Sequence, residues 1–220
     1  DIDVLAFDIQ DVGTRHYTYV STMAYAMEAC AKEGKKFVVF DRPNPLGGSY
    51  EGPTLKNGFE SFIGLYNLPL RHGLTVGEYA RFINKEYQIG ADLQVIPMKN
   101  WTRGMFFEQT ELPWIATSPN IPTETSAFCY AATGIVGDMN ISVGIGTTKP
   151  FEYVGAPWLD KLDFAAKLNV LEMPGVVFRP IAFIPNYGIY AGELCQGVQM
   201  HITDKRSFQP AHVGAQMVRL

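Results

Sequence analysis

Three carboxylates in the first quarter of the chain are well suited to acid–base chemistry. Asp8 and Asp11 follow an apolar run, and Glu51 lies in a stretch rich in turn residues. Carboxyl groups can donate and accept the proton of a reacting oxygen, and glycoside hydrolysis uses a pair of them in this way. We therefore take these three as candidate catalytic residues for a polar, neutral substrate. A helix N-terminus would also favour an acid at Asp11.

The stretch 36–53, KFVVFDRPNPLGGSYEGP, adds further polar side chains. Its apolar start predicts a buried strand, and its prolines and glycines predict a turn that neither a helix nor a strand would accept. Asp41, Arg42 and Asn44 follow the predicted strand directly. They are candidate substrate-binding residues, because ligands of open α/β sheets lie beyond the carboxyl ends of the strands. An Asp–Arg pair that only fixes a sharp turn explains them equally well.

Arg15 and Tyr17 follow the first acidic residues. A guanidinium group near acids is usually held for a carboxylate ligand or by those acids themselves. A tyrosine ring suits the face of a sugar, but core packing would use it equally well. Both residues are candidates for substrate binding.

Two loops in the second half carry the remaining candidates. In SPNIPTE, two prolines fix the backbone, so Ser118 and Asn120 would be presented in one geometry before Glu124. A capping loop for the following helix explains part of this motif and leaves Asn120 unexplained. In GTTKPFE, Thr148 and Glu152 are candidates, with a role as a surface helix residue as the alternative for Glu152. This loop lacks the GxxxxGK[ST] spacing of a phosphate loop, and its proline would block the helix that cradles phosphate.

Other chemistries have little support. The four histidines form no HxH or HxxxH pair, and the three cysteines form no CxxC pair, so we expect no metal site. The cysteines are expected to be buried apolar residues. No GxSxG motif is present, and no GxGxxG follows the first predicted strand, so neither serine hydrolase nor nucleotide-dependent chemistry is favoured.

Composition indicates a folded, globular chain. Its 220 residues are 47% hydrophobic and 18% charged, which suffices for one domain with a core, or a domain with a small lobe. The net charge of −4 argues against a nucleic-acid surface. No apolar run approaches the length of a membrane span.

Periodicity predicts an α/β fold. Strands and helices alternate in the first half, with strands at 4–7, 37–40 and 92–97 and helices at 19–33 and 75–87. A strand–helix–strand order implies parallel neighbours, so Asp8 and Asp41 should end at the same sheet edge. The second half predicts an α+β arrangement, with helices at 124–132, 159–170 and from 210, and strands at 176–184, interrupted by Pro180, and 197–203. Leu162, Ala165, Ala166 and Val170 would form the apolar face of the helix at 159–170.

Six motifs occur in order along the chain: FDIQDVGTRHYTYVSTM, DRPNPLGGSYEGP, RHGLTVGEYA, TSPNIPTETS, GTTKPFEYVGAPW and GELCQGVQMHITD. Together they resemble the bacterial exo-β-N-acetylmuramidase family, long catalogued as a domain of unknown function. The resemblance implies a Rossmann-like, mostly parallel sheet with helices on both faces over 1–135, and part of an α+β auxiliary domain over 136–220. It implies release of terminal N-acetylmuramic acid from peptidoglycan fragments, without a cofactor or metal. A periplasmic or secreted location follows as an expectation, and a homodimer stays open.

The same resemblance implies that both ends of the family's chain are missing here. The family's Phe-x-Pro-Glu-His-Gly motif, whose Glu is the favoured acid/base, would lie upstream. Arg15 would then bind the lactyl carboxylate of the muramic acid. Val143 and Ile145 stand where many members carry Glu and Arg, so those charges are lost or replaced by Asp138 or Lys149. The alternative function is a non-catalytic module that binds peptidoglycan.

Overall fold

The computed structural model describes residues 2–137 and 139–220, so Asp138 lies outside the described residues. The chain divides into two compact units, Asp1–Pro113 and Trp114–Leu220, and each is described here by itself. The division by contacts falls between residues 113 and 114. The domain boundary expected near residue 135 stays a prediction.

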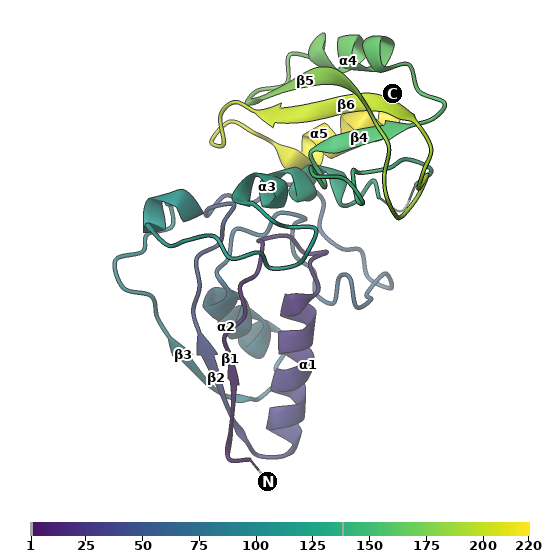
Figure 1. Ribbon diagram of the computed structural model, residues 1–220. Helices are drawn as coiled ribbons and strands as arrows, with labels where there is room; N and C mark the ends of the chain where they lie inside the picture. The colour runs from purple at the N-terminus through teal and green to yellow at the C-terminus, as the bar shows by residue number, and fades with distance from the viewer. Residues whose placement is uncertain (1, 138) are drawn as a thin grey trace. The chain divides into compact units, whose positions relative to one another are not determined.

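The first unit is built on a three-stranded parallel sheet in the order β1-β2-β3. Its elements are β1 (Val4–Phe7), α1 (Tyr19–Lys32), β2 (Lys36–Phe40), α2 (Val76–Glu86) and β3 (Asp92–Ile96), so a helix connects each pair of neighbouring strands (Figure 1). This confirms the predicted alternation of strands and helices. The carboxyl ends of all three strands lie at one edge of the sheet.

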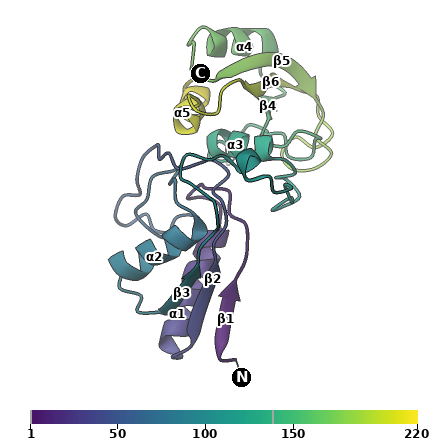
Figure 2. The ribbon, with the colours of Figure 1, turned by 90° about the vertical axis from the view of Figure 1, so that its left-hand side faces the viewer.

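Both helices of this unit pack on one face of the sheet. Two successive crossovers that advance in the same direction leave their helices on the same side. The core therefore joins alternate residues of the strands to α1 and α2, and its members include Phe7, Phe37, Val39, Met23, Met27, Tyr79 and Ile83. Helices were expected on both faces. In the described residues they cover one, and Figure 2 shows the strands beside the helices.

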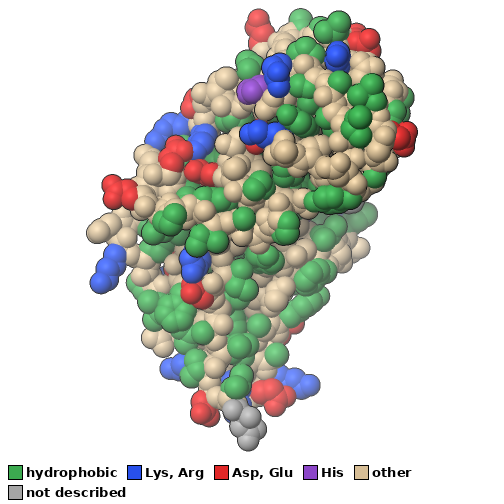
Figure 3. Space-filling view, in the orientation of Figure 1, with side chains coloured by type: hydrophobic (Ala, Val, Ile, Leu, Met, Phe, Trp, Pro, Cys, Tyr) green, Lys and Arg blue, Asp and Glu red, His purple; other side chains and the backbone are tan. Residues whose placement is uncertain are grey.

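The opposite face of this sheet carries exposed apolar side chains. Val4, Phe40 and Ile96 all belong to it by strand alternation, and each is exposed. Figure 3 shows hydrophobic side chains at the surface in the lower part of the view, where the strands lie. The face without helices therefore exposes an apolar side chain from each of the three strands.

The second unit contains a three-stranded antiparallel sheet in the order β4-β6-β5. α4 packs against β5 and β6 on one face, whereas α3 and α5 pack together on the other (Figures 1 and 2). The elements are α3 (Glu124–Thr133), β4 (Tyr153–Ala156), α4 (Lys161–Asn169), β5 (Val176–Phe183), β6 (Cys195–Ile202) and α5 (Pro210–Arg219). The predicted α+β arrangement is confirmed.

Local sequence signals account for most of these boundaries. Thr75 and Glu78 form a capping box at the start of α2, as predicted, and Thr123 caps α3. Pro180 lies in β5, which is an edge strand, as its missing N–H requires.

The predicted apolar face of α4 was correct for Ala165 and wrong for Leu162, Ala166 and Val170. Leu162 and Val170 are 63% and 76% exposed, and the buried residues are Phe164, Ala165 and Leu168. These three share a face at the i, i+1, i+4 spacing, and the large Phe164 ring sets which side of the helix turns inward.

The three cysteines are free and buried, as expected. None of the helices in the described part of the chain has the length and apolarity to cross a membrane.

Candidate active site

Polar side chains gather where β1 and β2 end in the first unit. The register pairs Phe7 with Val39, so Asp8 and Asp41 leave neighbouring strands at the same sheet edge, as predicted. Asp8 does not face Asp41 directly. Its Oδ1 pairs with the guanidinium of Arg42 at 2.8 Å, and both side chains are partly exposed. An accessible ion pair therefore marks this edge of the sheet.

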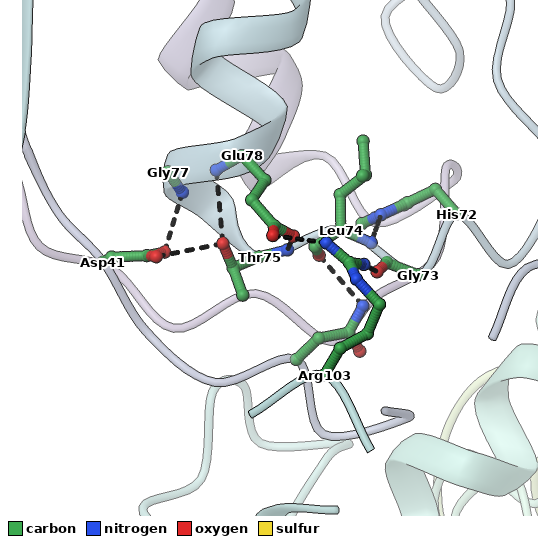
Figure 4. Close-up of polar contacts among 9 residues, drawn as sticks. Asp41, His72, Gly73, Leu74, Thr75, Gly77, Glu78 and Arg103 are labelled. Atoms are coloured by element: carbon green, nitrogen blue, oxygen red, sulfur yellow. Dashed lines mark hydrogen bonds and ion pairs between the residues drawn. The ribbon is translucent and has the colours of Figure 1, made fainter. Parts of the chain in front are cut away.

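The Asp41 carboxylate is hydrogen-bonded to the N-terminus of α2. Its Oδ1 accepts a hydrogen bond from the backbone N–H of Gly77 at 2.8 Å, and its Oδ2 accepts from Thr75 Oγ1 at 3.0 Å (Figure 4). Its Oδ1 also accepts from the backbone N–H of Arg42 at 3.0 Å. Burial raises the pKa of Asp41 against the lowering effect of these hydrogen bonds. The carboxylate thus ties the end of β2 to the start of α2.

Asp11, in the loop after β1, forms a buried pair with His72. Asp11 Oδ2 accepts from Gly13 N–H at 2.7 Å and lies 3.6 Å from His72 Nε2. His72 Nδ1 accepts from Leu74 N–H at 3.1 Å, so Nε2 carries the proton of the neutral ring. Within the described residues, Asp11 Oδ1 and His72 Nε2 have no hydrogen-bond partner. The pair therefore keeps one acceptor and one donor available.

The surroundings of this pair are apolar and closed. The His72 ring contacts the ring of Tyr79 edge to face, with centroids 5.4 Å apart. Burial raises the pKa of Tyr79, and the nearby charge of Asp11 adds to the effect. A low-dielectric site of this kind strengthens any interaction between Asp11 and a proton donor.

Asn44 organises the loop around this pair. Its Oδ1 accepts from Leu46 N–H at 2.9 Å, and its Nδ2 donates to the carbonyl of Leu74 at 2.9 Å. Gly13 packs so closely that a Cβ there would lie 2.1 Å from Asn44 Oδ1. Asn44 is buried and holds two loops together at the sheet edge.

Arg15 is engaged by the irregular segment 53–68. Its Nη1 donates to the carbonyl of Pro53 at 2.9 Å and to the carbonyl of Leu68. Burial lowers the pKa of this guanidinium. Tyr17 is buried and packs edge to face on Tyr19, with centroids 4.7 Å apart, so its ring belongs to the packed interior.

Glu51 lies beside a buried arginine that sequence reasoning missed. Glu51 and Arg71 exchange backbone hydrogen bonds at 2.9 and 3.0 Å, and the Arg71 guanidinium donates to the carbonyl of Leu46. Burial lowers the pKa of Arg71, and the charge of Glu51 opposes that shift. A buried arginine next to a carboxylate could hold an anionic or strongly polar ligand group.

The candidates of the second unit form two groups. Asn120 Oδ1 accepts a hydrogen bond from the hydroxyl of Tyr187 at 3.0 Å. The backbone N–H of Asn186 donates to Gly146 at 2.8 Å, so the loop before Thr148 lies against the loop that carries Tyr187. Thr148 itself is exposed, and Ser118 is half-buried.

The second group of polar side chains surrounds Glu152. Its carboxylate is buried, pairs with Lys149 Nζ at 3.2 Å and accepts from Gln199 Nε2 at 3.3 Å. Gln199 in turn accepts from Arg179 at 2.7 Å. The surface role that was the alternative for Glu152 does not fit this burial.

Glu124 has a separate partner. Its Oε1 pairs with Lys205 Nζ at 2.7 Å, at the start of α3. Val143, one of the two positions that depart from the family motif, is buried, and Ile145 is half-buried.

The structure thus brings together Asp8 with Arg42, and places Asp11, Asp41 and Asn44 in one hydrogen-bonded region of the first unit. It adds His72, Arg71, Tyr79 and Tyr187, which sequence reasoning did not select. The sequence feature that could have identified His72 is its motif, RHGLT, in which a histidine precedes a glycine and a helix cap. No group of three or more potential metal ligands occurs among the described residues.

The chain was compared with known proteins. Its residues 1–125 match the family "Exo-beta-N-acetylmuramidase NamZ, N-terminal", and residues 128–220 match "Exo-beta-N-acetylmuramidase NamZ, C-terminal". It is 50% identical over all 220 residues to the peptidoglycan beta-N-acetylmuramidase NamZ of Bacillus subtilis (strain 168), of which it covers 53%.

Two crystal structures of DUF1343 family proteins from Bacteroides fragilis NCTC 9343 share the fold. One has a TM-score of 0.95 at 43% identity, with 100% of this chain and 58% of the other covered. The second has a TM-score of 0.74 at 33% identity, with 90% and 53% covered. The chain spans about half the length of the relatives it matches. Two family matches that together cover nearly every residue show that the chain belongs to the NamZ exo-β-N-acetylmuramidase family.

Proposed function

We propose that the full-length protein is an exo-acting glycoside hydrolase that releases terminal N-acetylmuramic acid from peptidoglycan fragments, in cell-wall turnover and recycling. The observation that carries this proposal is the 50% identity to a peptidoglycan β-N-acetylmuramidase over the whole chain. The carboxylates at the sheet edge are the kind of group that such hydrolysis needs.

Asp8, Asp11 and Glu51 are the proposed acidic groups. Asp8 is exposed and paired with Arg42, so it can meet a substrate directly. Asp11 lies below the surface, where the N–H of His72 can stabilise its carboxylate and where Oδ1 has no hydrogen-bond partner among the described residues. Glu51 is held next to Arg71. These carboxylates would assist the acid/base glutamate that the family resemblance places upstream.

In the first unit, we assign direct contact with the substrate to exposed side chains and a supporting role to buried ones. Arg42 can reach a sugar hydroxyl from its partly exposed position, whereas Asp41, Asn44 and Tyr17 act by holding the site's shape. Arg15 is the proposed partner of the lactyl carboxylate, and its Nη1 already orders the adjoining loop. Losing Arg15 would therefore affect binding and local order together.

In the second unit, Ser118, Asn120 and Thr148 are the proposed partners of sugar hydroxyls or the N-acetyl group. Tyr187 fixes the orientation of the Asn120 amide by its hydrogen bond. Glu124 and Glu152 are each neutralised by a lysine, so we propose that they position the loops that carry these groups.

The test measures sugar release by the full-length enzyme. Purified protein is incubated with a MurNAc–GlcNAc disaccharide and with chromogenic MurNAc and GlcNAc glycosides, and free MurNAc is quantified by mass spectrometry. We expect turnover of the muramic-acid substrates only. Binding of peptidoglycan without any release of MurNAc would contradict the proposal and support a non-catalytic binding module.

Arg15→Ala tests the lactyl role within the same assay. It should lower kcat/KM for the MurNAc glycoside more than for the GlcNAc glycoside, because only muramic acid carries the lactyl carboxylate. Arg15→Lys keeps the charge and serves as the matched variant. An equal loss on both sugars would exclude the proposed contact.

We further propose a periplasmic or secreted location, because peptidoglycan lies outside the cytoplasmic membrane. Fractionation of cells that produce the full-length protein, followed by immunodetection, tests this. Recovery in the cytoplasmic fraction alone would contradict it.

A further inference from the structure

A cavity of the first unit is lined by none of the carboxylates described above. It is formed by the segment that follows β3, together with Pro43 from the loop after β2, and it has a volume of about 460 Å³. Small-molecule sites typically measure about 300–1,000 Å³. The cavity therefore has the size of a ligand site, at the carboxyl end of a parallel sheet where such sites occur.

The wall of the cavity is connected to the candidate active site. Gln10 Nε2 donates to the carbonyl of Pro43 and to the carbonyl of Asp11, both at 2.7 Å. Gln10 thus joins the backbone that carries Asp11 to the residue that lines the cavity. A ligand bound in the cavity would lie next to the acidic sheet edge.

The segment that forms the cavity is fixed in place. Arg103 donates to the carbonyl of Gly73 at 2.8 Å and pairs with Glu78 in the capping box of α2 (Figure 4). Phe106 is buried against Gly47, where an added Cβ would lie 3.0 Å from its ring. The hollow is therefore built by packed and hydrogen-bonded groups.

Trp101 lines the cavity and carries an unsatisfied donor. Its Nε1 is buried, and no described residue accepts its proton. Buried indole N–H groups ordinarily have a partner, so an unpaired one requires an explanation. A ligand oxygen that enters the cavity and turns the ring slightly would provide the missing acceptor.

The remaining lining favours a neutral ligand with hydroxyl or amide groups. Lys99 and Glu111 contribute one charge of each sign, so the cavity selects neither an anion nor a cation. Asn100 and Thr110 add neutral donors and acceptors beside the apolar Trp101. An aromatic ring together with neutral polar groups suits a pyranose sugar.

Two lining residues adopt a rare backbone conformation. Asn100 and Glu111 both have φ of 60°, in the left-handed region. For a glutamate this conformation is uncommon and costs free energy, and such strain concentrates at functional sites. Here it shapes both ends of the segment that encloses the cavity.

We propose that this cavity binds a neutral N-acetylated pyranose unit of the substrate, with Trp101 as the stacking and hydrogen-bonding residue. The identity of the sugar rests on the proposed function: it would be the N-acetylglucosamine that adjoins the released muramic acid. Binding to the cavity itself does not depend on hydrolysis, so the two proposals can fail separately.

The test follows the Trp101 indole N–H by ¹⁵N NMR during titration of the full-length protein with N,N′-diacetylchitobiose. The signal is assigned by its absence in Trp101→Phe. We expect it to move downfield on binding, because the proton gains an acceptor. A shift of the Trp158 indole signal alone would overturn the proposal.

Affinity for chitobiose is then measured by calorimetry in matched variants. Trp101→Ala should weaken binding at least tenfold. Asn100→Gly keeps the left-handed backbone and removes only the amide, so it should weaken binding severalfold in a folded protein even if Trp101→Ala misfolds. Trp158→Phe, in the other unit, should bind as the unchanged protein does.

Unchanged affinity in both cavity variants would overturn the proposal, as would tighter binding of cellobiose or of an alanyl-glutamate dipeptide than of chitobiose. Chitobiose binding that depends on Trp101, in a protein that releases no MurNAc, would support the cavity and reject only the proposed hydrolysis.

Discussion

His72 Nε2 lies 3.6 Å from Asp11 Oδ2, and the two side chains are only 1% and 5% exposed. Leu74 N–H fixes the tautomer of the ring by donating to Nδ1. The imidazole N–H is thus directed at a buried carboxylate whose second oxygen has no partner in the described part of the chain. This arrangement places a hydrogen-bond donor next to Asp11 without exposing either residue.

We expect Asp11→Asn in the full-length enzyme to lower kcat by about 10²–10⁴, the usual contribution of an acid or base. An amide keeps the size of the side chain but cannot exchange the proton. His72→Gln should lower kcat less, because the ring acts through Asp11. The measurement is steady-state hydrolysis of a MurNAc glycoside.

Asp8→Asn is the matched control for stability. Asp8 belongs to an exposed ion pair, which is worth about 0–1 kcal/mol, so its loss should hardly change unfolding. If Asp11→Asn and His72→Gln lose activity only in proportion to lost folded protein, their role is structural.

Asp41 should make the first unit less stable as pH rises. Burial raises its pKa in the folded state above the usual value of 3.8. A raised pKa means that the folded state binds the proton more tightly than the unfolded chain does. The resulting stability is complete below about pH 3.8 and is lost as pH rises through the higher folded-state pKa.

Asp41→Asn removes this titration. We expect the difference in free energy of unfolding, unchanged protein minus variant, to decrease as pH is raised from 3.5 to 7. Urea denaturation at several pH values measures it. A difference that stays level or increases would show that the hydrogen bonds from Gly77 and Thr75 outweigh burial.

Asp204 should give the opposite dependence of stability on pH. Hydrogen bonds, first from the Ser207 hydroxyl and next from Arg206 N–H, lower the pKa of this exposed carboxyl. Its contribution to stability is therefore present above its usual pKa of 3.8 and is lost as pH falls through the lowered value. In the same urea series, Asp204→Asn should have its largest cost near neutral pH. A cost that grows toward acid pH would contradict the assignment.

Much of the fold could be predicted from sequence, because its signals are local. Apolar runs gave the three parallel strands, and Thr75 with Glu78 marked the start of α2. The apolar face of α4 could not be read, since Leu162 and Phe164 are both apolar and only tertiary packing decides which is buried. The single covered face of the first sheet likewise depends on strand order.

The site was predicted less completely, because its contacts are long-range. The convergence of Asp8 and Asp41 at one sheet edge followed from the parallel order of their strands. The pairing of Asp11 with His72 depends instead on contacts between irregular loops that are distant in the sequence. Thr14 and Glu51 both form backbone bridges with Arg71, and this link carries His72 to the sheet edge. No periodicity in the sequence encodes such a bridge.

Gly13 should be the least replaceable glycine at the sheet edge. Its φ is 84°, and a Cβ would overlap the Asn44 side chain, which would lose its bonds to Leu46 and Leu74. We expect Gly13→Ala to lower the free energy of unfolding by about 2–5 kcal/mol, from backbone strain plus broken hydrogen bonds. Chemical denaturation measures it.

Gly34→Ala provides the control for Gly13. Gly34 has φ of 61°, but nothing lies within 4 Å of an added Cβ. Only the backbone term applies there, at about 1–2 kcal/mol. Equal costs at the two positions would mean that Asn44 moves aside freely and does not fix the loop.

In the second unit, Lys149 should be needed because Glu152 is buried. The Glu152 side chain is 6% exposed, and Lys149 provides the positive charge at 3.2 Å. Lys149→Met should destabilise the protein by about 1–3 kcal/mol, since it leaves a buried carboxylate whose hydrogen bond comes from the amide of Gln199. Adding Glu152→Gln should recover more than half of that loss, because the uncompensated charge is gone.

Lys167→Met, which breaks the exposed pair with Asp163, should cost less than about 0.5 kcal/mol. The double-mutant cycle is measured by urea denaturation. A cycle with no coupling energy would show that Glu152 is stabilised by Gln199 and the backbone, and that Lys149 is available for substrate.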